Sequence, residues 1–293
     1  MCLDAGGVAS LIYSWNPFTI VSCVGSCTSP VENFMVVIAI YGACSRIAPL
    51  AAFGWVMATH FSLHAVILLR PVILLLGYGP DGPPSKLFLH KNPNATGSSI
   101  KPVVYFTIWA AIWSCYVLLL IIISLKGLDV LSEMLKKTHG FILKVEDLSP
   151  NIGVLWAFFL ILFHVNILFM VLPLAIRLMH RPCFLAFVYI TIISMLKSYP
   201  SVGDAALYLG LLGLLVNELA KMKFSFFLFC GYIEVSLLSP VMHNLWIWRG
   251  TRNANFYFAT GLGYACLQTV LVVESVSKML NYDRILRKQL HTA

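Results

Sequence analysis

Charged residues are scarce in this chain: Asp, Glu, Lys and Arg together occupy 11% of its 293 positions, against roughly 25% in an average soluble domain. Hydrophobic residues account for 59%, and they occur in long unbroken blocks without the polar alternation of water-facing elements. A soluble core of this size could not bury so much apolar surface. The composition therefore excludes a soluble globular protein and predicts an all-α, multi-span membrane protein.

Basic residues are absent before Arg46, so the N-terminus lacks the basic region of a cleaved signal peptide. We therefore expect membrane insertion to depend on internal spans. The net charge of +8 is spread over short loops and a basic tail at 276–293, without the basic stripe that nucleic acid requires. The expected partners are membrane lipids, and no nucleic acid.

Residue patterns typical of catalytic and metal sites are also missing. Cys23 and Cys27 have no His or second Cys pair positioned to complete a zinc site, and most of the eight cysteines lie in apolar runs. A carboxylate pair, a nucleophile with its base and a glycine-rich phosphate loop are all absent at any specific spacing. We therefore expect no catalysis by this chain itself, no metal and no cofactor.

The clearest membrane span covers residues 103–125, which carry no charge and exceed the roughly 20 residues needed to cross a bilayer. About eight transmembrane or broken membrane helices are expected in a single polytopic domain over 1–293. Arg46 with Pro49 should kink or break the predicted segment 34–58, and Arg70 with Pro71 should do the same in the segment 60–78. The remaining predicted segments are 34–58, 60–78, 154–176, 183–196, 205–216, 224–238 and 256–273.

The distribution of Lys and Arg gives an orientation. If the tail is cytosolic, alternation of the spans places eleven basic residues on the cytosolic side and seven opposite. The segments 126–151, 197–204 and 239–255 then face the lumen. The loop with the glycosylation sequon at Asn94 is then cytosolic, so no oligosaccharide is expected there.

Asp147 to Pro150 predict the start of a helix near Asn151.

A polar interruption at 197–204 separates two apolar segments of only 14 and 12 residues. Paired short segments with a Gly/Pro break often mark irregular backbone that lines a polar cavity. An ordinary lumenal turn between two slightly longer spans explains the same pattern equally well. In both cases Lys197 and Asp204 can form an ion pair across the turn.

A second polar interruption, at 243–255, combines tryptophans suited to the membrane interface with Arg249, Arg252, Asn253 and Asn255. These side chains could hold phosphate and sugar hydroxyls of a lipid head group. The alternative is an aromatic belt followed by a solvated loop. Polar residues within spans are expensive and are either functional or paired between helices; the candidates are His164, Asn166, Glu234 and Glu274.

Five stretches together resemble one known family. They read NPFTIVSC at 16–23, DLSPNIG at 147–153, PLAIRL at 173–178, KSYPSVGDAALY at 197–208, and NLWIW followed by NANF within 244–256. In this order they are similar to the GPI transamidase subunit U family of the endoplasmic reticulum, most closely its plant members. The resemblance extends over most of residues 16–285.

The resemblance implies a non-catalytic, multi-pass subunit of the endoplasmic reticulum complex that joins GPI lipid to the C-terminus of precursor proteins. In that family the nucleophilic Cys and its His belong to a separate, caspase-like subunit, and subunit U helps to hold the GPI glycolipid. Carried over by position, Asn253 and Asn255 would lie near the lipid head group, with 197–204 close by. The other transamidase subunits would be this chain's partners.

The chain departs from the family pattern in two places. The family's further N-terminal span and long lumenal region have no counterpart before Trp15, and an aromatic, acidic stretch is missing between Trp156 and the span with Pro173. We therefore expect a shortened chain.

Two other functions stay open. One is a glycosyltransferase that uses a dolichol-linked sugar, because the family resembles multi-span lipid-sugar transferases in architecture. Such an enzyme uses an acidic residue in an early lumenal loop as its base. The only acidic residues before the second span are Asp4 and Glu32, and neither lies in a suitable context. The other is a transporter, suggested by the short paired segments.

Overall fold

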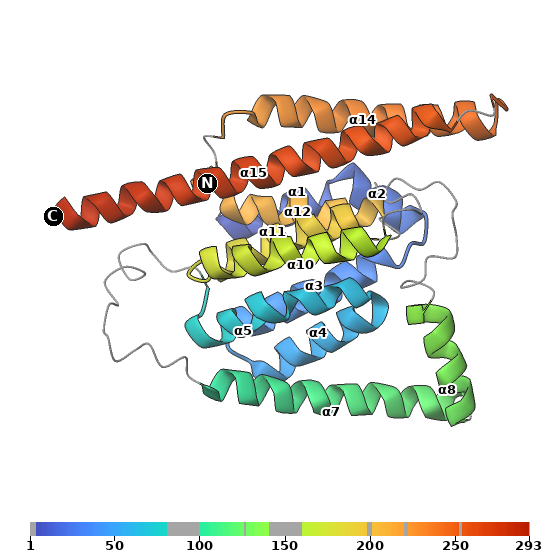
Figure 1. Cartoon of the computed structure of the whole chain (residues 1–293), viewed down its shortest axis with the longest axis vertical. Helices are drawn as coiled ribbons and strands as arrows, with labels where there is room; N and C mark the ends of the chain where they lie inside the picture. The colour runs from blue at the N-terminus through green and yellow to red at the C-terminus, as the bar shows by residue number, and fades with distance from the viewer. Residues whose placement is uncertain are drawn as a thin grey trace. The chain divides into compact units, whose positions relative to one another are not determined.

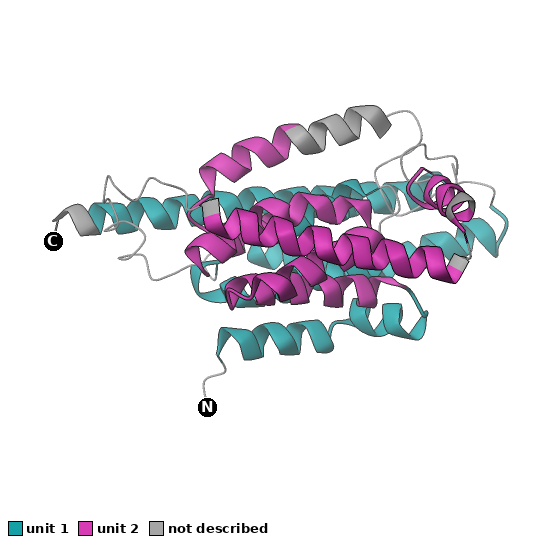
Figure 2. Ribbon diagram, turned by 90° about the horizontal axis from the view of Figure 1, so that it is seen from below, with its two compact units in different colours: residues 1–27, 148–168, 190–293 teal, residues 28–147, 169–189 magenta. Residues whose placement is uncertain are grey.

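The computed structural model describes residues 4–80, 100–125, 127–140, 160–197, 201–219, 222–251 and 254–292. Every regular element within these ranges is a helix, which confirms the all-α class. The chain forms two compact units (Figure 2). Unit 1 comprises residues 1–27, 148–168 and 190–293, and unit 2 comprises 28–147 and 169–189. Helices α10 (Leu160–Arg177) and α11 (Pro182–Leu196) each contribute to both.

Unit 1 begins with a bent helix pair that the sequence did not predict. Helices α1 (Ala5–Ser14) and α2 (Pro17–Val24) meet at 48° and together are apolar enough to form one broken span. The bend follows from Asn16, whose side chain accepts a hydrogen bond from Phe18 N at 3.0 Å while Pro17 occupies the first helical position. The predicted spans begin at residue 34 and therefore do not include this pair.

The predicted short segment 205–216 is part of a longer helix. Helix α12 (Val202–Leu212) continues through a 3₁₀ turn, η4 (Gly213–Leu215), into α13 (Val216–Leu219). The whole is an 18-residue candidate span. The prediction ended too early because Asn217 and Glu218 are polar, yet a single turn of helix carries both.

The last two helices of unit 1 also exceed their predicted lengths. Helix α14 (Ser225–Ile247) runs past the expected end at Leu238 with Pro240 inside it, so most of the predicted loop 239–255 is helix. Helix α15 (Asn255–Thr292) has 38 residues, about 57 Å, and includes the predicted tail. No Gly or Pro after Gly263 interrupts it. The two helices pack side by side (Figure 1).

Unit 2 opens with a helical hairpin where one span was predicted. Helices α3 (Ser29–Cys44) and α4 (Ala48–Phe61) are separated by a turn at which Arg46 has φ 58°. The break near Arg46 and Pro49 is confirmed, but the chain also reverses direction there. A Cβ on Gly42 would lie 2.6 Å from Ala51 N, and one on Gly54 would lie 2.5 Å from Ala39 N. The two backbones thus approach too closely for any other residue.

The rest of unit 2 packs against this hairpin. The predicted segment 60–78 is a 3₁₀ helix, η1 (Leu63–Leu68), followed by α5 (Leu69–Tyr78). Helix α7 (Ile100–Leu125) confirms the clearest predicted span and contacts both α4 and α5. Helix α8 (Leu128–Leu135) and a π turn, η3 (Lys136–Gly140), follow it. The buried core consists mainly of small and aliphatic residues: Ala39, Ala43, Ala51, Ala52, Val72, Leu75, Leu76 and Phe106.

Four helices in the described ranges are long and apolar enough to cross a membrane, or five if α1 and α2 form one span. Three shorter apolar helices cover Ser29–Cys44, Leu63–Tyr78 and Pro182–Leu196. The helix expected near Asn151 and the sequon at Asn94 lie outside the described residues.

Candidate functional site

Unit 1 contains a cavity of about 900 Å³ bounded by α2, α12, α14, α15 and the end of α11. Its walls are largely apolar: Val21, Leu209, Phe229, Ile233 and Leu271 line it from four different helices. Along α14 the lining extends from Ser225 to His243, a distance of about 27 Å. That length is close to the hydrocarbon thickness of a bilayer, roughly 30 Å. The cavity therefore has the composition and length of a site for hydrocarbon chains.

The two interruptions singled out in the sequence both border this cavity. Ser201 and Val202 reach it from the first interruption, and His243 from the second. Asn16, Pro17 and Phe18, at the bend between α1 and α2, line it as well. Segments at opposite ends of the chain thus meet at one site.

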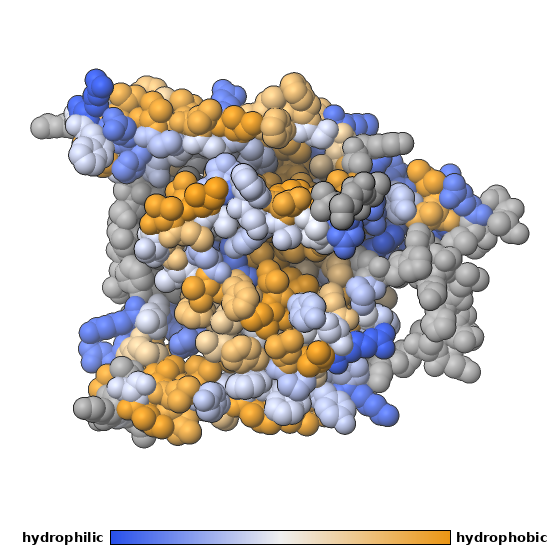
Figure 3. Space-filling model, turned by 180° about the vertical axis from the view of Figure 1, so that it is seen from behind, coloured by the Kyte–Doolittle hydropathy of each residue, from blue (hydrophilic) through white to orange (hydrophobic). Residues whose placement is uncertain are grey.

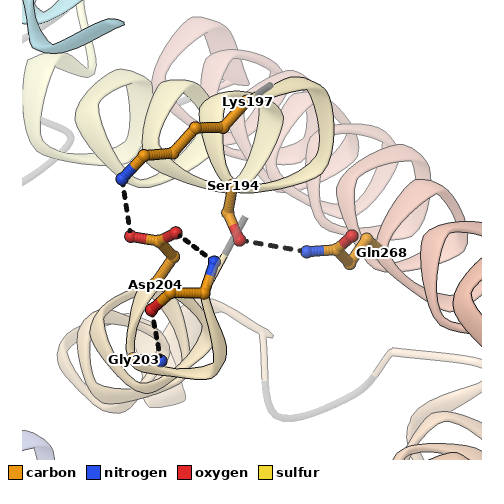
Figure 4. Close-up of polar contacts among 6 residues, drawn as sticks. Ser194, Lys197, Gly203, Asp204 and Gln268 are labelled. Atoms are coloured by element: carbon orange, nitrogen blue, oxygen red, sulfur yellow. Dashed lines mark hydrogen bonds and ion pairs between the residues drawn. The ribbon is translucent and has the colours of Figure 1, made fainter. Parts of the chain in front are cut away.

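Lys197 and Asp204 form the expected ion pair, with 3.3 Å between Lys197 Nζ and Asp204 Oδ1. Asp204 also accepts a hydrogen bond from Ser201 N at 2.8 Å, while Ser201 Oγ accepts one from Gly203 N at 3.0 Å (Figure 4). This capping box fixes the first turn of α12, and such caps stabilise a helix by about 1 kcal/mol. Both charged side chains are largely buried. The pair therefore ties α11 to the start of α12 at the edge of the cavity.

Aromatic rings gather at the other border. Trp246 stacks on Tyr257 with centroids 6.1 Å apart, and the ring of His243 meets that of Tyr257 edge-on at 5.4 Å. Arg249 is exposed just beyond the end of α14, and Asn255 is the exposed first residue of α15. Arg252 and Asn253 lie outside the described residues.

A cluster of polar groups interrupts the apolar walls. The Tyr208 hydroxyl lies 3.2 Å from that of Tyr232 and 2.9 Å from that of Tyr264. Gln268 Nε2 donates to Tyr208 Oη at 3.5 Å and to Ser194 Oγ at 3.2 Å. Figure 4 shows Gln268 reaching from α15 toward Ser194 on α11. These bonds join α11, α12, α14 and α15.

A count of protons shows that the cluster has one donor to spare. Three phenols carry three protons, and the two contacts among them use two. The Tyr208 oxygen already accepts a hydrogen bond from Gln268 Nε2, so it can accept only one more. Its own proton is therefore donated to one of the two other tyrosines. Tyr208 donates its proton to Tyr232 and accepts one from Tyr264, so the remaining proton belongs to Tyr232, which lines the cavity. It has no acceptor among the described residues, so the cavity offers a hydrogen-bond donor to its occupant.

This cluster was not predicted from the sequence, because the candidates chosen within the spans were His164, Asn166, Glu234 and Glu274. Glu234 is exposed on α14, and Glu274 is half-buried on α15; neither forms an ion pair within the part of the chain that the structure describes. His164 and Asn166 belong to α10, but their side chains lie outside the described set. The presence of Gln268 and three tyrosines in otherwise apolar helices could have indicated the cluster.

Comparison with known proteins places the chain in a family. The model of the family "GPI transamidase subunit PIG-U" matches residues 4–264. The chain belongs to this family. It is 33% identical over 282 residues to the human GPI-anchor transamidase component PIGU, covering 90% of this chain and 60% of the relative. The GPI transamidase component GAB1 homolog of Schizosaccharomyces pombe is 29% identical over 286 residues, covering 94% of the chain and 64% of the relative.

Membership of the PIG-U family confirms the resemblance seen in the sequence. The chain spans about 60% of the length of the human relative. The family match begins at Asp4 and so includes the bent pair α1 and α2. Four of the five helices that border the cavity, α2, α11, α12 and α14, lie wholly within the matched residues, and α15 begins within them. Within the described residues, no group of three His, Cys, Asp or Glu side chains could hold a metal ion.

Proposed function

We propose that this chain is a non-catalytic subunit of a GPI transamidase complex, which binds GPI lipid and presents it for attachment to the C-terminus of precursor proteins. The observation that carries the proposal is the apolar cavity of unit 1, found in a chain of the PIG-U family. Its length suits hydrocarbon chains, and its polar cluster supplies a donor for a carbonyl or hydroxyl group of the lipid.

The head group would lie beyond the aromatic border of the cavity. Arg249 and Asn255 flank the segment that joins α14 to α15, and Tyr257, two residues after Asn255, lines the cavity. We propose that they bind lipid phosphate and sugar hydroxyls together with Arg252 and Asn253. In this arrangement Lys197 and Asp204 hold the rim in place, and the catalytic Cys and His belong to a caspase-like partner in the endoplasmic reticulum membrane.

The test is a complementation experiment in cells that lack their own PIG-U protein. Ile233→Trp adds bulk inside the cavity, whereas Leu238→Trp adds the same bulk on α14 at a position that does not line it. We expect wild type and Leu238→Trp to restore GPI-anchored proteins at the cell surface, and Ile233→Trp to restore at least about five-fold less.

Co-purification of the catalytic subunit, measured in the same cells, separates the two parts of the proposal. All three proteins should co-purify with it at equal levels. Failure of the wild-type chain to co-purify would refute the subunit role. Equal surface display by wild type and Ile233→Trp, with normal co-purification, would refute the lipid-holding role.

A further inference from the structure

Helix α8 and the turn after it form an amphipathic segment in unit 2. Pairs of apolar residues alternate with pairs of polar residues along it. The apolar pairs are Val130 and Leu131, and Met134 and Leu135; the polar pairs are Ser132 and Glu133, and Lys136 and Lys137. Such a repeat places all apolar side chains on one face of a helix. Val130 and Leu135 remain 42% and 38% exposed, so this face is not fully covered by unit 2.

The placement of α8 fits a helix that lies in the membrane interface. Helix α7 is a 24-residue candidate span from Lys101 to Ser124, and α8 contacts its end. Figure 1 shows α8 running across the direction of α7. A helix across the end of a span lies in the plane of the membrane, with its apolar face toward the acyl chains.

Between α4, α7 and α8 lies an open groove of about 450 Å³. One wall is a stripe of α7 from Tyr116 to Ser124, a length of about 12 Å. Phe53 and Met57 of α4 form the opposite wall, and Met134 of α8 closes one end. The lining is almost entirely apolar, as an acyl chain requires. In Figure 3, where α7 runs along the bottom of the view, orange side chains are mixed with pale blue and white ones.

Polar groups of both signs lie on α8 and just after it, next to the end of the groove that Met134 closes. His60 lines the groove, and its ring lies 6.3 Å from that of His139. The imidazole of His60 can act as a hydrogen-bonding group at this end of the groove. Lys137 Nζ is 2.7 Å from Glu133 Oε1, and Lys136 follows α8 directly. Two ammonium groups beside a carboxylate complement a head group that carries both a phosphate and a cation.

We propose that α4, α7 and α8 form a site for one zwitterionic phospholipid, separate from the cavity of unit 1 and independent of the function proposed for it. An acyl chain occupies the groove between Met57 and Leu120. The phosphate contacts Lys136 and the His60–His139 pair, and Glu133 faces the choline or ethanolamine cation. A bound phospholipid would hold α8 against α4 and α7.

The site can be tested by photocrosslinking of the full chain in phosphatidylcholine nanodiscs. A small fraction of the phosphatidylcholine carries a diazirine near the ester end of one acyl chain, and the labelled peptides are identified by mass spectrometry. We expect labelling concentrated on the groove residues of α7 and on Met134. Labelling spread evenly over Ile112 and Leu119, which face outward on α7, would show surrounding bilayer lipid only and would overturn the proposal.

Matched variants separate the groove from the rest of α7. Val117→Trp fills the groove, whereas Leu118→Trp changes the next residue, which is exposed and does not line it. Labelling of Met134 should fall at least about five-fold in the first and stay unchanged in the second. An unchanged signal in Val117→Trp would also overturn the proposal.

A head-group variant leaves the groove intact. Lys136→Glu should reduce labelling of the groove residues about three-fold, with Lys223→Glu, an exposed lysine of unit 1, as the control. Nanodiscs of phosphatidylglycerol form a second arm, because their lipid lacks the cation that Glu133 would face. Equal labelling by both lipids, or no difference between the two lysine variants, would contradict the zwitterionic site.

Discussion

The two units leave different amounts of space between their helices, although both contain close glycine contacts. In unit 2, small residues let α3 and α4 approach until the backbones touch at Gly42 and Gly54, and the core is filled with Ala, Val and Leu. In unit 1, Asn16 at the bend between α1 and α2 and the rings of Tyr232 and Tyr264 line a cavity of about 900 Å³. The comparison teaches that the packing of side chains between helices decides how much space a membrane protein leaves for a ligand.

The largest effect should come from the tightest contact. Gly54→Ala places a Cβ 2.5 Å from Ala39 N, so α3 and α4 must separate. We expect the free energy of unfolding to fall by about 2 to 3 kcal/mol, measured by thermal denaturation in detergent. Gly77→Ala is the control, since its Cβ would meet only Pro102 Cγ at 4.0 Å. Equal melting temperatures would show that the hairpin is not close-packed.

A smaller loss is expected at the rim of the cavity. Asp204→Ala removes both the partner of Lys197 and the cap of α12, so stability should fall by about 1 to 2 kcal/mol. Glu133→Ala breaks the exposed pair with Lys137 in unit 2 and should leave the melting temperature in detergent unchanged. If the two variants lower the melting temperature equally, Asp204 does not organise the rim.

The smallest effect concerns the polar cluster. Tyr232→Phe removes one of the three hydroxyls in contact and should lower stability by no more than about 1 kcal/mol. Binding of GPI lipid should weaken about five-fold, because the cavity loses a hydrogen-bonding group. Tyr116→Phe, in the groove of unit 2, provides the matched control. Equal GPI-lipid binding by both variants, in a lipid pull-down with purified protein, would contradict a role for the cluster.

Sequence patterns predicted features that depend on neighbouring residues. The uncharged run at 103–125 identified α7, and Arg46 with Pro49 identified a break. The reversal of direction at that break was missed, because it depends on Gly42 and Gly54 meeting residues of the opposite helix. The predicted ends of α14 and α15, at residues 238 and 273, were also wrong. Both helices continue past these positions because polar side chains fit a helix that extends beyond the hydrocarbon core of the bilayer.

The amino-acid sequence by itself determined that this chain is an all-α membrane protein of the PIG-U family, and it indicated that Lys197 and Asp204 can pair. Those conclusions rest on composition, on ordered motifs and on residues seven positions apart. Only the tertiary structure decided that 16–18, 201–202 and 243 border one cavity, and that Tyr208 joins Tyr232, Tyr264 and Gln268 inside it. Helices far apart in sequence meet through side-chain packing, which local pattern does not encode.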